Sequence, residues 1–476
     1  MRNHGPSLLL GLLALASACT SDSESPEPAT TDAATSGDVD AGTASNEHEP
    51  SAGPTYWKDM VPLFEQHCLQ CHREGGIAPF RMDEYSAVKP LAKLIARATS
   101  ERTMPPWAVT SDGSCGTFAD SLALSDEEIA KIGAWAETGA AEGQPGTIEL
   151  PEIPTLAEAA EFVTPEFEPV AQGGKLAEAD EYRCFVVDRP KGATGYVTGY
   201  EVIPGRAEIV HHLAAFIIDP DASASGADGK PVSMTNRERM QQLNDESPDR
   251  IGWPCFGAAG DGVEIEGLPV VWAPGQGVVN FPKGTGVPLE PHHQVVIQIH
   301  YNLSDPSHRG LSDSTKLRLR IAQEVEEVGV FVTQDPLLNT LYEDEPTTLP
   351  PGMKSTHYVW KSRFDDMGLD EIKGAKLYGV MPHMHALGRT YNMTITQPGV
   401  GAACAAQVDN WNFHWQRMYF WEKPYELTGD TELAVDCEYD TSSVTAPVEP
   451  GWGTSNEMCL ATLFFTVPRE HYKDIF

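Results

Sequence analysis

The chain has 476 residues and a formal net charge of −36, from 33 Lys and Arg against 69 Asp and Glu. This length predicts about three domains of ~150 residues each, and a hydrophobic content of 41% is sufficient for folded cores. The strongly acidic balance argues against nucleic acid as a partner, because phosphate groups would repel the chain.

The first 19 residues have the composition of an export signal. Arg2 supplies a positive start, residues 8–15 form a short apolar run, and small residues precede Cys19. We predict that Cys19 is the lipidated first residue of a bacterial lipoprotein, anchored to a membrane in the periplasm or cell envelope. A simple cleaved signal is the alternative. Residues 20–54 are rich in Ser, Thr, Ala, Pro and acids, without Lys or Arg, which predicts a disordered acidic tether.

Cys68, Cys71 and His72 form a CxxCH motif, the attachment signature of haem c. Two thioether bonds hold the porphyrin in such a site, and the histidine binds the iron. A disulfide or a zinc site is the alternative reading. Zinc would require further nearby ligands, and only His67 and Cys115 are close. The motif therefore predicts a covalently bound haem, which needs an electron donor.

Helical periodicity surrounds this motif. Apolar residues at helical spacing precede it and recur over 88–98, and Ser125 with Glu128 forms a capping box at the start of a third helix. Residues 55–142 are therefore predicted to be a small all-α cytochrome c domain. We expect Met104 to be the sixth iron ligand, since a thioether raises the reduction potential. Two other methionines are alternatives, Met60 and Met82.

The remaining chain has a different pattern. Residues 143–180 are rich in Pro and Glu and predict a linker. Beyond them, short apolar runs alternate with Gly, Pro, Asp and Asn, and no long amphipathic helix is evident, which is typical of all-β sandwiches. A break near 322–328 divides this part into two sandwiches, 181–325 and 326–476. We expect the polar stretch 219–256 to be a surface loop.

Five histidines lie in apolar runs, where an imidazole is costly unless it is hydrogen-bonded or bound to a metal. They are His211, His212, His300, His383 and His385. The last two are two positions apart and share one face of a strand. The adjacent pair can bind a single ion only if the strand bulges or ends there. Buried, hydrogen-bonded histidines are the alternative, and the pair His292 and His293 is read as structural.

Met458 opens the last apolar run, in the segment Glu457-Met458-Cys459. A lone methionine is more commonly a core residue. Beside imidazoles, however, a thioether selects copper, and Cu(I) in particular, over zinc. The sequence therefore predicts two ligand sets. One has the three imidazoles of His211, His212 and His300, and the other has His383, His385 and Met458.

Four segments, in this order, resemble the copper type II, ascorbate-dependent monooxygenases, which include peptidylglycine alpha-hydroxylating monooxygenase and dopamine beta-monooxygenase. The segments are the HH pair, Gln298-x-His300-Tyr301, the HxHxLG segment that begins at His383, and Cys437 followed by Glu457-Met458-Cys459. The resemblance covers roughly residues 180–470. It implies two jelly-roll-type sandwiches whose coppers face each other across a solvent cleft.

The resemblance also implies roles for single residues. The three-imidazole set would hold the electron-transfer copper, and the set with Met458 would hold the oxygen-binding, catalytic copper. A disulfide between Cys437 and Cys459 would pin the strand that presents Met458. Cys184 with Cys255 is one further pairing that the remaining cysteines allow.

These features together predict a copper-dependent monooxygenase that hydroxylates a C–H bond of a small organic substrate with O2. Electrons would enter through the haem, with ascorbate or another reductant as their source. Where the peptide-amidating members carry an arginine two residues before the HxH segment, this chain has Met381, which favours a neutral or apolar substrate. The alternative is a tethered haem and copper protein for electron transfer or copper binding, without oxygenase activity. A hydroxylated product coupled to O2 uptake distinguishes the two.

Overall fold

The computed structural model describes residues 53–475, except for 77, 173–178, 227–230, 257, 275, 367–372 and 414. The predicted export signal, Cys19 and residues 20–52 of the predicted tether lie outside the described residues. Among the helices of the described part, none is both long enough and apolar enough to cross a membrane.

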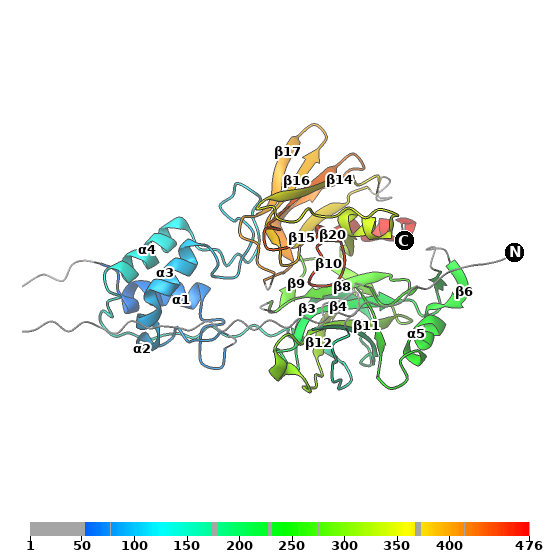
Figure 1. Cartoon of the computed structure of the whole chain (residues 1–476), viewed down its shortest axis with the longest axis horizontal. Helices are drawn as coiled ribbons and strands as arrows, with labels where there is room; N and C mark the ends of the chain where they lie inside the picture. Colours follow the sequence, from blue (N-terminus) through cyan, green and yellow to red (C-terminus); the bar gives the residue numbers. More distant parts are fainter. Residues whose placement is uncertain are drawn as a thin grey trace, which may run out of the picture. The chain divides into compact units, whose positions relative to one another are not determined.

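The segment that carries the CxxCH motif is helical (Figure 1). Its elements are η1 (Tyr56–Met60), α1 (Val61–His67), α2 (Tyr85–Val88), η2 (Lys89–Leu91), α3 (Ala92–Ser100) and α4 (Asp126–Glu137). Tyr56, Phe64 and Trp135 are fully buried in a core that these helices share. The predicted capping box is present, since the hydroxyl of Ser125 accepts from the amide of Glu128 and the Glu128 carboxylate accepts from the amide of Ser125. We refer to residues 53–142 as the helical part.

A single nine-stranded sheet runs through both halves of the β part. In spatial order its strands are β1 (Ala159–Val163), β12 (Lys316–Ala322), β3 (Gly195–Ile203), β10 (Thr285–Leu289), β13 (Glu327–Gln334), β20 (Leu460–Pro468), β15 (Lys376–His383) and β18 (Tyr419–Glu426), and β9 (Val279–Asn280) pairs with β3. The contact of β10 with β13 is parallel, and it joins strands from before and after the break predicted near 322–328. The two halves are therefore linked by backbone hydrogen bonds as well as by the chain.

Two smaller sheets complete the cores. The five-stranded sheet has the order β7 (Trp253–Pro254), β2 (Asp180–Val187), β11 (Gln294–Asn302), β4 (Val210–Ile218) and β8 (Gly267–Trp272). The four-stranded sheet has the order β14 (Thr356–Arg363), β19 (Glu432–Tyr439), β16 (Gly388–Gln397) and β17 (Gly401–Val408). Apolar residues of the first pack against β3, β10 and β12, and those of the second pack against β13, β15 and β20. This mostly-β arrangement agrees with the predicted sandwich class.

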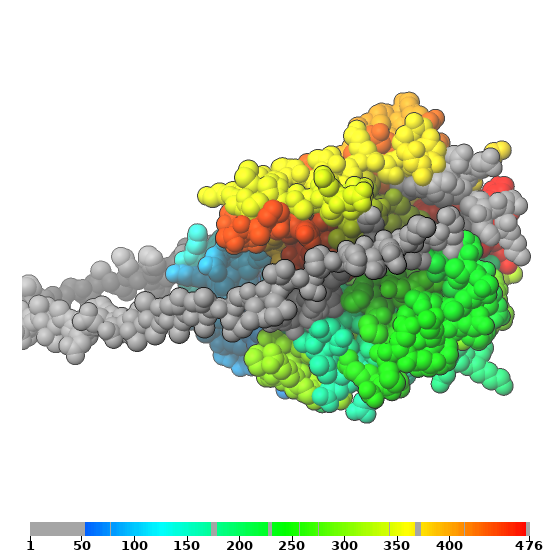
Figure 2. Space-filling model, turned by 45° about the vertical axis from the view of Figure 1, so that its right-hand side comes forward, coloured from blue at the N-terminus to red at the C-terminus, as the bar shows by residue number. Residues whose placement is uncertain are grey.

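Two predictions of irregular structure were wrong. The expected linker contains β1, which pairs with β12 from Ala159 to Val163 and buries Phe162 completely. A strand of five residues is too short to show periodicity in the sequence. The expected surface loop contains α5 (Asn236–Asp245), whose capping box of Thr235 and Glu238 is visible in the sequence. Its surface is green in Figure 2.

The other short elements are β5 (Ser223–Ser225), β6 (Pro231–Thr235), η3 (Pro306–His308), α6 (Pro336–Asn339), η4 (Thr340–Tyr342) and α7 (Arg469–Ile475). Three disulfides join distant segments. Cys184–Cys255 and Cys437–Cys459 are the pairings considered from the sequence, and each has a Cα–Cα distance of 5.9 Å. Cys115–Cys404 was not foreseen, and it connects the helical part to β17.

Candidate metal centres

The structure brings His211, His212 and His300 together at one end of the five-stranded sheet. One ligand atom from each lies within 4.8 Å of the other two, and the Nδ1 atoms of His211 and His300 are 3.4 Å apart. His300 is paired with His212, whereas Tyr301 is paired with Val210, so His211 is the extra residue of a β-bulge. The bulge turns two adjacent imidazoles toward one point, as a shared metal ion requires.

Asp180 orients His300 from the neighbouring strand. Its Oδ1 lies 3.2 Å from Nε2 of His300, which leaves Nδ1 of His300 directed toward His211. Burial raises the pKa of Asp180, but hydrogen bonds from His300, Thr454 and Asn302 more than offset this and hold the pKa below its usual value. A carboxylate on the second ring nitrogen fixes the tautomer of a metal-binding histidine. The ring of Tyr182 is stacked on His300 at 4.1 Å.

His383 and His385 form the second imidazole group, with ring centroids 5.0 Å apart. His383 ends β15, and His385 follows it on the same side. Nδ1 of His383 is hydrogen-bonded to Oε1 of Gln416, and Nδ1 of His385 is 2.9 Å from the carbonyl oxygen of Asn456. Both partners are acceptors, so each ring donates from Nδ1 and keeps an unprotonated Nε2 for a metal.

Glu457 fixes the backbone of this second group. Its two carboxylate oxygens accept from the amides of His385 at 2.8 Å and Leu387 at 2.7 Å. Met458, the next residue, is 2% exposed. Since His383 is paired with Leu460, the antiparallel register continued by two residues makes Met458 level with His385.

The two imidazole groups adjoin each other. The ring centroids of His212 and His383 are 6.2 Å apart, and the ring of Phe413 lies 4.9 Å from His211 and 5.7 Å from His385. The rings of the two ligand sets thus lie near each other, because the continuous sheet holds β15 beside the first core.

The chemistry of these donors fits copper. His212 Nε2 is buried and has no hydrogen-bond partner among the described residues, a costly state that a bound metal would relieve. Burial lowers the pKa of His212, that of His383 to about 4 and that of His385 to about 3, so all three are neutral ligands at neutral pH. An imidazole set completed by the thioether of Met458 would suit copper better than zinc.

The haem motif has a compatible geometry. Cys68 and Cys71 are not disulfide-bonded, and Nδ1 of His72 lies 3.0 Å from the carbonyl oxygen of Phe80, which leaves Nε2 of His72 for iron. Burial lowers the pKa of His72. Met104 is half-buried. Of the alternatives, Met60 is completely buried in the helical core, and the Met82 amide donates to the carbonyl oxygen of His72. The choice of Met104 remains a prediction.

Three supporting residues were missed in the sequence, namely Asp180, Phe413 and Gln416. Asp180 was placed at the end of the expected linker, although an acidic residue that opens an apolar strand could have been noticed. Nothing local in the sequence marks Phe413 or Gln416. They lie between β17 and β18 and approach the histidines only in the folded chain.

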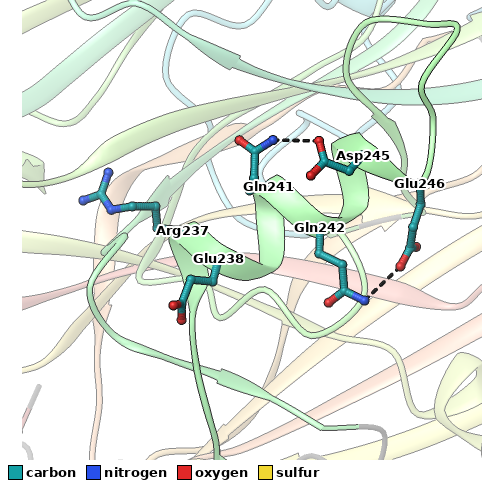
Figure 3. A pocket seen from close by; sticks show the side chains of 6 residues that line it. All are labelled: Arg237, Glu238, Gln241, Gln242, Asp245 and Glu246. Carbon is teal, nitrogen blue, oxygen red and sulfur yellow. Dashed lines mark hydrogen bonds between the residues drawn. The ribbon is translucent and has the colours of Figure 1, made fainter.

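Two other groups of polar side chains lie outside these centres. Glu266, His292 and His293 have ligand atoms within 4.8 Å of one another. There, Nδ1 of His293 accepts from the amide of Glu290, so the ring proton lies on Nε2 and is donated to Glu266 at 2.6 Å, which occupies the nitrogen a metal would need. The second site is a hollow on the surface of α5 (Figure 3). There the amide groups of Gln241 and Gln242 donate hydrogen bonds to the carboxylates of Asp245 and Glu246.

Comparisons with known proteins agree with the resemblance. Residues 336–473 match the family model for the copper type II ascorbate-dependent monooxygenase, C-terminal domain. DBH-like monooxygenase protein 1 of Homo sapiens is 24% identical over 41% of this chain and 32% of that protein. Tyramine beta-hydroxylase of Caenorhabditis briggsae is 19% identical over 56% and 41%, and dopamine beta-hydroxylase of Rattus norvegicus is 20% identical over 59% and 42%. The chain thus spans about a third to two fifths of the length of these curated relatives.

Proposed function

We propose that the chain is a copper-dependent monooxygenase that hydroxylates a C–H bond of a small organic substrate. The observation that carries the proposal is the proximity of two imidazole groups, in which acceptors lie at the second ring nitrogens of His300, His383 and His385. His211, His212 and His300 would hold one copper, and His383, His385 and Met458 the other. Copper at these sites supplies one-electron redox chemistry and the reduction of O2.

The chain's own residues prepare both sites. Asp180, Gln416 and the carbonyl of Asn456 set the tautomers of the ligating rings, so that little reorganisation is needed when a metal binds. The ring of Phe413 lies against the first group, 4.9 Å from His211 and 5.9 Å from His212.

We also propose that Cys68, Cys71 and His72 hold a haem c and that it delivers electrons to the copper sites. Hydroxylation with O2 consumes two electrons beyond those of the substrate, and a c-type haem supplies them one at a time. Ascorbate or a one-electron donor protein would reduce the haem again. Met104 is the proposed sixth ligand.

The substrate is proposed to be neutral or apolar. Met381, two residues before His383, is 7% exposed and packs in the first core, so it offers no charge for a substrate carboxylate. The three disulfides suit an oxidising compartment. We therefore propose an exported protein in the periplasm or cell envelope, with its membrane anchor at Cys19.

The test has two steps on one purified sample. A pyridine haemochrome spectrum and metal analysis should show one haem and about two coppers per chain. Oxygen uptake in the presence of a reductant should then yield a hydroxylated product from a neutral aromatic or alkyl substrate, and His383→Ala should abolish product. Haem and copper without any coupled product would support the electron-transfer alternative. Turnover of a glycine-extended peptide at a comparable rate would refute the substrate assignment.

A further inference from the structure

An extended arm of the helical part, residues 105–122, is built into the second half of the β part. Trp107, Val109 and Phe118 are at most 6% exposed and belong to the core of the four-stranded sheet. The amide of Thr110 donates to the carbonyl of Gln407 at 2.8 Å. The amide of Ala119 donates to that of Phe420, also at 2.8 Å. The Cys115–Cys404 disulfide fixes the tip of the arm.

One end of the arm contacts the residue that precedes the haem motif, and the other end follows Met104. Nδ1 of His67, the residue before Cys68, lies 3.2 Å from the carbonyl oxygen of Leu122. A segment held at both ends and along its length cannot swing freely, so the helical part has a fixed attachment to β17 and β18.

The loop between these two strands contacts both the helical part and the metal-site histidines. We call residues 409–413 and 415–418 the coupling loop, and the proposal uses only these described residues. On one side, the Asn410 amide group donates to the carbonyl of Glu101 at 3.1 Å, and the Arg417 guanidinium lies 5.0 Å from the ring of Trp107. On the other side, Gln416 is hydrogen-bonded to His383 and its Nε2 donates to the carbonyl of Phe413.

Phe413 extends these contacts to the other imidazole group. Its ring lies 4.9 Å from His211 and 5.9 Å from His212. Gln416 and Arg417, which face opposite partners, are adjacent in sequence. The coupling loop thus connects the arm with histidines of both groups through hydrogen bonds and ring contacts.

We propose that the coupling loop is the electron-entry segment, through which the helical part is electronically connected to the copper sites. This inference rests on the proposed function. Each transfer oxidises one ferrous haem to ferric haem and reduces one Cu(II) to Cu(I), so two transfers load both sites. Between them, an external one-electron donor of the ascorbate or small-cytochrome class reduces the haem. Asn410 and Arg417 are positioning residues, because they touch neither haem nor copper.

The test is a flash-photolysis measurement on the full-length holoenzyme under anaerobic conditions. A photogenerated flavin radical reduces the haem, and its reoxidation is followed optically while the Cu(II) signal is followed by electron paramagnetic resonance. The variant is Asn410→Ala combined with Arg417→Met. The matched control is Arg469→Met, which removes another guanidinium from an aromatic ring, that of Tyr196 at 5.6 Å, away from the loop.

We expect the double variant to slow haem reoxidation about tenfold, with an unchanged haem potential and unchanged direct reduction of the coppers by ascorbate. The control should transfer electrons as the wild type does. If the double variant does not fold, Asn410→Ala alone, at an exposed position, should give a smaller slowing in the same direction. Equal rates in wild type and variants would overturn the coupling loop alone. A wild type whose reduced haem never reoxidises would overturn haem entry itself, and with it this inference.

Discussion

The imidazole rings of His212 and His383 lie 6.2 Å apart between their centroids, although one stands in β4 and the other ends β15. The two strands belong to different sheets, and the residues are 171 positions apart in sequence. Because these two rings are neighbours, the two proposed copper sites would lie next to each other. An electron that reaches either site then has a short path through protein to the other.

Asp180→Asn should weaken copper binding at the three-imidazole group. The substitution preserves shape, but an amide accepts less strongly than a carboxylate from Nε2 of His300, so the tautomer is no longer fixed. We expect the affinity for the first-site copper to fall about 10- to 100-fold, measured by titration against a competing chelator. Asp436→Asn is the control, because Asp436 pairs with the exposed His357 at 2.8 Å. An unchanged copper affinity in Asp180→Asn would show that this carboxylate does not support the three-imidazole group.

Much of the site was predictable because its ligands lie in conspicuous apolar strands. The requirement for a bulge at His211 and His212 followed from strand alternation alone, and the register of β4 with β11 fulfils it. The supporting residues were not predictable, since Gln416 and Phe413 reach the histidines through tertiary packing. The proximity of the two groups also depended on the parallel contact of β10 with β13, for which no local pattern exists.

Helices, too, were predictable only where a local sequence signal was recognised. The capping box of Ser125 predicted the start of α4 correctly. The equivalent box of Thr235 was overlooked because α5 has few apolar residues, and a polar stretch was interpreted as a loop. Strand β1 has five residues, and its burial of Phe162 depends on a partner 155 positions away, Leu317. Short elements of this kind are determined by the neighbour they pair with.

Phe162→Ala tests whether the segment before residue 180 is structural. Phe162 is completely buried against the first core, so its truncation should lower the free energy of unfolding by about 3–5 kcal/mol. Ile153→Ala lies in the same segment but at a residue that is 53% exposed, and it should change stability by less than about 0.5 kcal/mol. Urea unfolding monitored by tryptophan fluorescence measures both. Similar small effects would mean that the segment is a linker after all.

Asp335→Asn should stabilise the protein at neutral pH. Burial raises the pKa of Asp335 to about 6, from a usual value near 3.8. Between these values the folded state keeps a proton that the unfolded state releases, so the free energy of unfolding falls as pH rises, by about 2–3 kcal/mol in total. Asparagine retains the acceptor for the amides of Leu338 and Cys459 and removes the charge.

The measurement for Asp335 is the unfolding midpoint between about pH 4 and pH 7. The wild type should lose stability across this window through Asp335, and the variant should show a flatter profile. Asp305→Asn serves as the contrast, because a hydrogen bond from the Ser307 side chain lowers the pKa of Asp305 and its charge is favourable. An Asp335→Asn protein that is less stable than wild type at pH 7 would contradict the assignment.

Glu457→Gln should loosen the second imidazole group without removing a ligand. The carboxylate of Glu457 accepts from two backbone amides, those of His385 and Leu387. A glutamine offers one oxygen, and its NH2 group must then face an N–H donor, which leaves a buried donor unsatisfied. The expected loss of stability is about 1–3 kcal/mol, measured by urea unfolding of the metal-free protein.

In the copper-loaded protein, copper at His383 and His385 should dissociate faster than copper at the three-imidazole group. Glu438→Gln, on β19 with a hydrogen bond to Ser355 at 2.7 Å, is the control and should alter neither quantity. If Glu457→Gln and Glu438→Gln have the same effects, the Glu457 carboxylate does not support the site. The register of β15 with β20 alone then holds the histidines in place.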